Sequence, residues 1–253
     1  MNQAPYGIIK QASPQFPVRE LLVVPHGNND LTVGYPAFGR DIYERNLEFI
    51  SRDYSHPKTG ERISFRPSST HESISVAACG FGSNEEFDAK RDIFDLRCLQ
   101  AGYIVRTKEG VFTNTQITNE EKLKSLLIKA EKVKGIYLID DIMAFAPYES
   151  FQRGVQDCDT FAQGGLARAL EHTSENVANN LREITSHKHY KGGVNVWDFD
   201  DVKKPILKVV SLYSNRDIDG GRLDVNGYDW NGYINGYAFG VLNKSAEGTR
   251  IKK

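Results

Sequence analysis

The segment SLYSNRDIDGGRLDVNGYDWNGYINGY, from Ser211 to Tyr237, decides how this chain is interpreted, and it is called the tract below. Most of its positions hold Asn, Asp, Gly, Ser or Tyr, and almost all the others hold Leu, Val, Ile, Arg or Trp. It contains no Lys, Glu, Gln, Met, Pro, Ala or Thr, although the rest of the chain uses Lys and Glu freely. Neither solubility nor folding selects such a two-part alphabet. The tract therefore indicates a fixed scaffold with interchangeable residues between its fixed positions.

A turn-rich surface loop is the simpler interpretation of the tract. Turns favour Gly, Asn and Asp because these residues tolerate positive φ angles, which accounts well for Gly220 and Gly221. It accounts less well for the large apolar residues that recur among them, such as Trp230 and Ile234, or for the missing Lys and Glu.

The genetic code offers a more specific explanation. Asparagine is encoded by AAC or AAT, and substitution at the two adenines alone gives Asp, Gly, Ser, Tyr and others, but never Lys, Glu, Gln, Met, Trp or a stop. We predict that the positions drawn from this set, called the soft positions, are variable and bind ligand: Ser214, Asn215, Asp217, Asp219, Gly220, Gly221, Asp224, Asn226, Gly227, Tyr228, Asp229, Asn231, Gly232, Tyr233, Asn235 and Tyr237.

The remaining positions of the tract have the complementary property. Trp, Leu, Val, Arg, Phe, Ala and Gly all have codons without adenine, so such codons resist this kind of mutation. Ile218 and Ile234 are exceptions, because every Ile codon contains adenine. We predict a scaffold role for seven residues: Leu212, Arg216, Arg222, Leu223, Val225, Trp230 and Phe239.

The tract and the sequence Ala238–Leu242 that follows it resemble the variable region of proteins diversified by a diversity-generating retroelement. Within that family the similarity points to variable proteins of archaea or archaeal viruses. A reverse transcriptase there copies a template with errors at adenines, and the copy replaces a segment near the 3′ end of the gene. The resemblance covers about residues 206–242. It implies a C-type lectin fold, of the subtype related to formylglycine-generating enzymes, with variable side chains facing solvent and scaffold side chains facing inward.

Two physical features agree with that expectation. The alternation in Leu223–Asn226 suits a strand, which sends successive side chains to opposite faces. Tyr supplies rigid contact area while Ser, Gly and Asn supply adaptable hydrogen bonds, as in antibody loops. We expect Tyr228, Tyr233 and Tyr237 to anchor a ligand and Trp230 to pack in the core.

The whole chain, residues 1–253, is predicted to be a single α+β domain with irregular loops, in which two or more helices pack on a small, mostly antiparallel sheet. Strands are expected at 21–24, 63–66, 74–79, 136–139, 194–199, 206–212 and 238–242, and a hairpin over 102–115. Helices are expected over 41–52, 118–135, 157–170 and 174–184. Thr118 is the expected N-cap of the helix over 118–135, and Ser174 is the expected N-cap of the helix over 174–184.

Composition excludes several classes of partner. The net charge of −1 gives no electrostatic footprint for nucleic acid or membrane surfaces. No apolar run approaches the roughly 18 residues of a membrane span, and the N-terminus lacks the pattern of a secretory signal. We therefore expect no membrane insertion. Display on a cell stays open, and the missing signal favours a location inside a cell or on a virion. Cys79, Cys98 and Cys158 have no metal or redox spacing.

Other candidate sites have simpler explanations. His187 and His189 are expected in a solvated loop rather than as a metal pair, and Asp140-Asp141 in a surface loop. Gly164-Gly165 is expected to mark close packing of another element, since no phosphate-binding motif surrounds it.

Two alternative functions follow from the implied fold. A formylglycine-generating oxidase uses cysteines late in the domain, whereas the last one here is Cys158. A calcium-dependent lectin is suggested by Trp230-Asn231, but Gly232 stands where that motif has Asp. A calcium loop starting at Asp224 fails at its sixth and twelfth positions. We expect no catalytic residue, metal or cofactor, and a target that is a protein or another cell-surface molecule.

Overall fold

The computed structural model describes residues 18, 20–82, 98–215, 220–227 and 236–243. They form a mixed α+β fold, which confirms the predicted class. The strands make two sheets in which most neighbours are antiparallel, rather than one small sheet. No helix among the described residues is both long enough and apolar enough to cross a membrane.

The smaller sheet has five strands in the order β1-β2-β16-β5-β4. Helix α1 (Tyr43–Ile50) packs beside it, where Phe38, Phe49, Ile50 and Phe65 form a local core. The five strands are β1 (Glu20–His26), β2 (Asn29–Tyr35), β4 (Asp53–Ser55), β5 (Arg62–Pro67) and β16 (Gly240–Leu242).

The larger sheet has eleven strands, with the main order β11-β12-β14-β13-β6-β7-β10-β9-β8, while β15 pairs with β6 and β3. Helix α4 (Glu120–Lys129) packs near its β7–β10 end through Leu123. The strands are β3 (Phe38–Asp41), β6 (Cys98–Arg106), β7 (Gly110–Thr113), β8 (Glu131–Val133), β9 (Ile136–Leu138), β10 (Ala144–Pro147), β11 (Gly154–Gln156), β12 (Val194–Trp197), β13 (Ile206–Asn215), β14 (Arg222–Asn226) and β15 (Gly236–Ala238).

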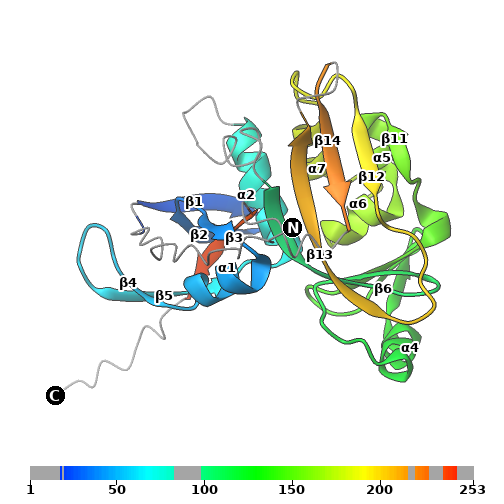
Figure 1. Cartoon of the computed structure of the whole chain (residues 1–253), viewed down its shortest axis with the longest axis horizontal. Helices are drawn as coiled ribbons and strands as arrows, with labels where there is room; N and C mark the ends of the chain where they lie inside the picture. The colour runs from blue at the N-terminus through cyan, green and yellow to red at the C-terminus, as the bar shows by residue number, and fades with distance from the viewer. Residues whose placement is uncertain (1–17, 19, 83–97, 216–219, 228–235, 244–253) are drawn as a thin grey trace, which may run out of the picture.

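Helices α5 (Cys158–Gln163), α6 (Gly165–Leu170) and α7 (Asn179–Thr185) lie against one face of β11, β12, β14 and β13 (Figure 1). Helix α2 (Thr70–Gly82) lies between the two sheets, next to β1, β6 and α7 (Figure 1). One continuous apolar cluster joins these elements and forms the main core of the protein.

The expected strand at 74–79 is wrong, because these residues lie within helix α2. The helix is buried around almost its whole circumference, including Ile74, Val76 and Ala77. A helix that is apolar on every side loses its 3.6-residue periodicity, so its sequence is easily mistaken for that of a buried strand.

Helix boundaries differ from the sequence predictions at three places. The helix expected over 157–170 is broken at Gly164 into α5 and α6. Asn119, not Thr118, caps α4 by accepting from the Lys122 amide. Helix α7 begins after Ala178 rather than at Ser174, and no side chain of its own N-cap residue bonds to it.

Candidate functional site

The described part of the tract forms strands inside the larger sheet. β13 and β14 are antiparallel, and their register pairs Ser211 with Asn226 and Asn215 with Arg222. β12 lies parallel on the other side of β14 and pairs Val194 with Leu223. β14 is therefore an interior strand with a partner at each edge, which holds its backbone firmly.

One face of these strands belongs to the main core. Leu212, Leu223, Val225 and Phe239 are each at most 1% exposed and pack in the apolar cluster against the helices. This is the placement predicted for scaffold residues. Burial of such side chains contributes about 1.5–3 kcal/mol each.

The opposite face carries a polar network. The Arg222 Nε donates to Asp224 Oδ1 at 2.9 Å, and the Asn215 Nδ2 donates to Asp224 Oδ2 at 3.0 Å. Arg222 thus shares a face with Asp224, so its predicted inward orientation is wrong. Both oxygens of Asp224 accept hydrogen bonds from neighbours, which disfavours this carboxylate as the first ligand of a calcium loop.

Four of the described soft positions, Gly227 among them, are buried, which contradicts the prediction that they face solvent. Ser214 is 1%, Asn226 3% and Tyr237 6% exposed. Ser214 follows Leu212 on the core face of β13, where a small side chain fits. The Tyr237 hydroxyl accepts from Arg40 Nε at 2.7 Å, and its ring belongs to the main core, so it does not anchor an external ligand as predicted.

The glycines among the soft positions are constrained by the backbone. Gly220 and Gly221 have φ angles of +81° and +65°, and a Cβ on Gly221 would lie 2.1 Å from the His189 carbonyl oxygen. A Cβ on buried Gly227 would lie 2.8 Å from the Asp198 carbonyl oxygen. A larger residue at Gly221 or Gly227 would therefore force the backbone to move, so the predicted exchangeability of these two positions is wrong for this backbone.

Among the described soft positions that are not glycine, Asn215 and Asp224 are partly exposed and have negative φ angles. Eight further soft positions and two predicted scaffold residues lie outside the described residues. These positions are Asp217, Asp219, Tyr228, Asp229, Asn231, Gly232, Tyr233 and Asn235, together with Arg216 and Trp230.

Asp224 lies in a row of side chains that crosses the sheet. The register places Val155 opposite Asn195, Asn195 beside Asp224, and Asp224 opposite Tyr213. Val155 is 62% exposed, and Trp197, one step along the same face, is 50% exposed. Val155, Asn195 and Trp197 are not among the predicted site residues. A Trp at the outward position of the alternating segment Val194–Trp197 is the signal that could have revealed the face.

The other candidate sites are structural. The rings of His187 and His189 stack at 4.9 Å, and no group of three potential metal ligands occurs among the described residues. Asp140 Oδ1 accepts from the amides of Ile142 and Met143 and so stabilises a turn. A Cβ on Gly165 would lie 2.0 Å from Ser150 Oγ, which confirms close packing there.

The three cysteines are unpaired thiols. Burial raises the pKa of Cys98 to about 11, although a hydrogen bond with Ser211 opposes this shift. A thiol of such high pKa carries little thiolate at neutral pH, which is the nucleophilic form.

Comparison of the chain with protein-family models, with curated proteins and with solved structures finds no match.

Proposed function

We propose that the protein is a ligand-binding protein without catalysis of its own, whose tract is diversified by adenine-directed mutagenesis on a C-type lectin fold. Its target is a protein or another cell-surface molecule. Binding is reversible surface complementarity, in which a rigid sheet supports exchangeable side chains.

The observation that carries the proposal is the division of the tract across β14. Leu223 and Val225 are completely buried between two partner strands and the helices, whereas Asp224 between them is partly exposed beside Asn195 and Tyr213. An interior strand with a buried apolar face keeps its register when an outward side chain changes. This arrangement supports the separation of scaffold and contact residues that the codon pattern suggests.

Burial reduces the number of soft positions that can contact a ligand. Replacing Ser214, Asn226 or Tyr237 would disturb packing, and replacing Gly221 or Gly227 would force the backbone to move. The proposal therefore assigns recognition to Asn215, Asp224 and the soft positions outside the described residues.

A comparison of two libraries tests the proposal. One library of the full chain randomises eight codons: Asp217, Asp219, Tyr228, Asp229, Asn231, Gly232, Tyr233 and Asn235. The other randomises Ser214, Asn226, Gly227 and Tyr237. Displayed variants are sorted for resistance to protease, and the first library is then selected on immobilised proteins.

We expect most members of the first library and few of the second to stay folded, and selection to yield binders with different targets. Equal loss of folding in both libraries would refute the proposal. The DNA beside the gene provides an independent check: it should contain a reverse transcriptase gene and an imperfect copy of codons 211–242, with mismatches at template adenines.

A further inference from the structure

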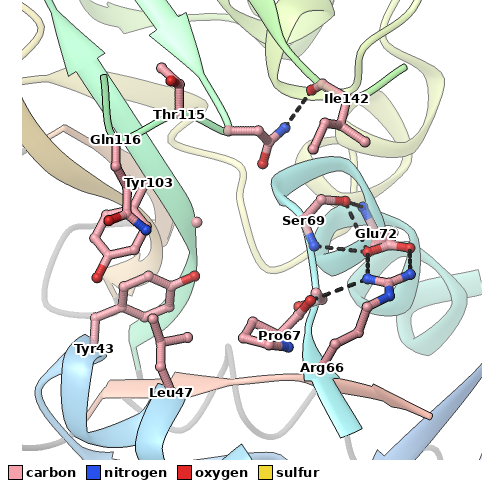
Figure 2. A pocket seen from close by; sticks show the side chains of 13 residues that line it. Tyr43, Leu47, Arg66, Pro67, Ser69, Glu72, Tyr103, Thr115, Gln116 and Ile142 are labelled. Atoms are coloured by element: carbon pink, nitrogen blue, oxygen red, sulfur yellow. Dashed lines mark hydrogen bonds and ion pairs between the residues drawn. The ribbon is translucent and has the colours of Figure 1, made fainter. Parts of the chain in front are cut away.

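A second candidate site is a pocket of about 670 Å³ at the junction of the two sheets, remote in sequence from the tract (Figure 2). Its lining comes from α1, from the end of β5, the start of α2 and the connection between them, from β6, from residues 114–116 and from Ile142. Its volume is in the range of pockets that hold small organic ligands.

The charged groups of the pocket are already paired. Arg66 donates to both oxygens of Glu72, at 2.8 Å and 2.6 Å, and Glu72 also accepts from the amide of Ser69 at 2.8 Å. Burial alone would raise the pKa of Glu72, but the hydrogen bonds from Arg66 and Ser69 lower it to about 2. The pair is ionised at neutral pH and has no net charge, so it gives no preference for a charged ligand.

Asn114 holds the part of the wall next to the start of α2. This residue has a positive φ of 52°, its Oδ1 accepts from the Thr70 amide at 2.7 Å, and its Nδ2 donates to the Ile142 carbonyl at 2.7 Å. These bonds fix three chain segments around the pocket. The pocket is thus formed before any ligand enters it.

The remaining lining is aromatic and apolar. The rings of Tyr43 and Tyr103 meet edge to face at 4.9 Å, and Leu47 and Pro67 lie close by. Figure 2 shows the Tyr43 ring directed toward the cavity. Burial raises the pKa of Tyr43 further above its ordinary value, so its hydroxyl stays protonated and can donate a hydrogen bond.

We propose that this pocket binds a neutral small molecule that carries one aromatic ring and an amide or hydroxyl group. The ring would pack against Tyr43, Leu47 and Pro67, while its polar group would meet the Tyr43 hydroxyl and the Gln116 amide. The pocket contains no residue of the tract, so the outcome of a test of this proposal does not bear on the proposed function.

Ligand-observed NMR with a matched trio of probes tests the pocket. Benzamide is neutral, benzoate anionic and benzylamine cationic at pH 7, and the three have nearly the same size. We expect benzamide at millimolar concentration to show saturation transfer from the full-length protein, with the other two at least about fivefold weaker. The Tyr43→Phe variant, which removes one hydrogen bond, should weaken benzamide binding by about 3–10-fold.

A bulky substitution at the mouth of the pocket provides the control. Gln116 is exposed, so Gln116→Trp should leave folding intact and abolish the benzamide signal by filling the cavity. Gln152→Trp, at an exposed position that does not line this pocket, should leave the signal unchanged. The proposal is overturned if benzamide does not bind, if a charged probe binds as well as benzamide, or if Gln116→Trp has no effect.

Discussion

Replacing Glu171 by Gln should change how the stability of the protein depends on pH. Glu171 follows α6 and caps the start of α7, where its Oε1 accepts from the Leu181 amide at 2.5 Å and its Oε2 from the Asn180 amide at 3.3 Å. Burial raises the pKa of Glu171 to about 7, although these two backbone hydrogen bonds oppose the shift. The carboxyl group is therefore half protonated near neutral pH in the folded protein.

The sign of the effect follows from linkage. A carboxyl whose pKa is higher in the folded state stabilises the fold fully below its unfolded pKa of 4.5, and this contribution is lost as pH rises through about 7. A pKa difference of about 2.5 units at about 1.4 kcal/mol per unit gives about 3.5 kcal/mol over the whole range.

His71 acts in the opposite direction. Burial, and next the neighbouring His26, lower the pKa of His71 from 6.5 to about 4. Because His71 resists protonation in the folded state, the free energy of unfolding of the protein falls as pH falls from about 6.5 to about 4. Because the two contributions oppose each other between about pH 4.5 and 6.5, they nearly cancel in the natural protein. Glu171→Gln removes one of them and leaves the loss on acidification.

Urea unfolding at pH 4.5, 5.5, 6.5 and 7.5 measures the effect, with the free energy of unfolding taken from the midpoint and slope. The difference in the free energy of unfolding, Glu171→Gln minus the natural protein, should rise by about 2–3 kcal/mol from pH 4.5 to pH 7.5. The matched control is Glu175→Gln, which removes an exposed carboxylate from the same connection and should shift all four values equally. A constant difference between Glu171→Gln and the natural protein across this range would refute the reasoning.

Three further outcomes test the geometry. Gly221→Ala should lower the free energy of unfolding by at least about 2 kcal/mol, because its Cβ would meet the His189 carbonyl. The control Gly60→Ala, with φ of +73° and no atom within 4 Å of the new Cβ, should lower it by about 1 kcal/mol. Equal losses in chemical denaturation would contradict this. Leu223→Ala should cost about 2–5 kcal/mol. Asp224→Ala should cost less, about 1–2 kcal/mol, because it removes the hydrogen bonds from Arg222 and Asn215 but leaves no apolar cavity. The reverse order in thermal unfolding would show that the faces of β14 are misassigned. Asn114→Ala should lower the free energy of unfolding by about 2–3 kcal/mol, because it removes the hydrogen bonds to Thr70 and Ile142. The control Asn176→Ala, at an exposed position, should lower it negligibly. Similar urea midpoints for both variants would exclude this role of Asn114.

Local patterns in the sequence predicted much of the fold. The hairpin over 102–115 and the strands at 194–199 and 206–212 are present, because alternation and short turns specify strands locally. The helix α2 was missed, since its apolar residues cover its whole surface and show no single stripe. The break at Gly164 was missed; beside it Gly165 packs against Ser150, a contact that the local pattern does not reveal.

The candidate sites were predictable to a smaller extent. Codon type separates Leu223 and Val225 from Asp224, and the structure places these residues on opposite faces. It does not separate Asp224 from Asn226, because burial of Asn226 arises from neighbours that are far away in the chain. The pocket lined by Tyr43, Tyr103 and Asn114 has no sequence motif at all, since it exists only where two sheets meet.

The contrast between codon type and burial has a consequence for the proposed mechanism. Mutagenesis that acts on adenines cannot distinguish an exposed Asn codon from a buried one, whereas folding can. If the tract is diversified, changes at Ser214, Asn226 and Tyr237 arise as often as elsewhere but yield proteins with disturbed cores. Copies of the gene from a single population should therefore differ mostly at Asn215, Asp224 and the soft positions outside the described residues. Equal amino-acid diversity at the buried positions would mean that this backbone rearranges to accept it, and the rigid scaffold would have to be abandoned.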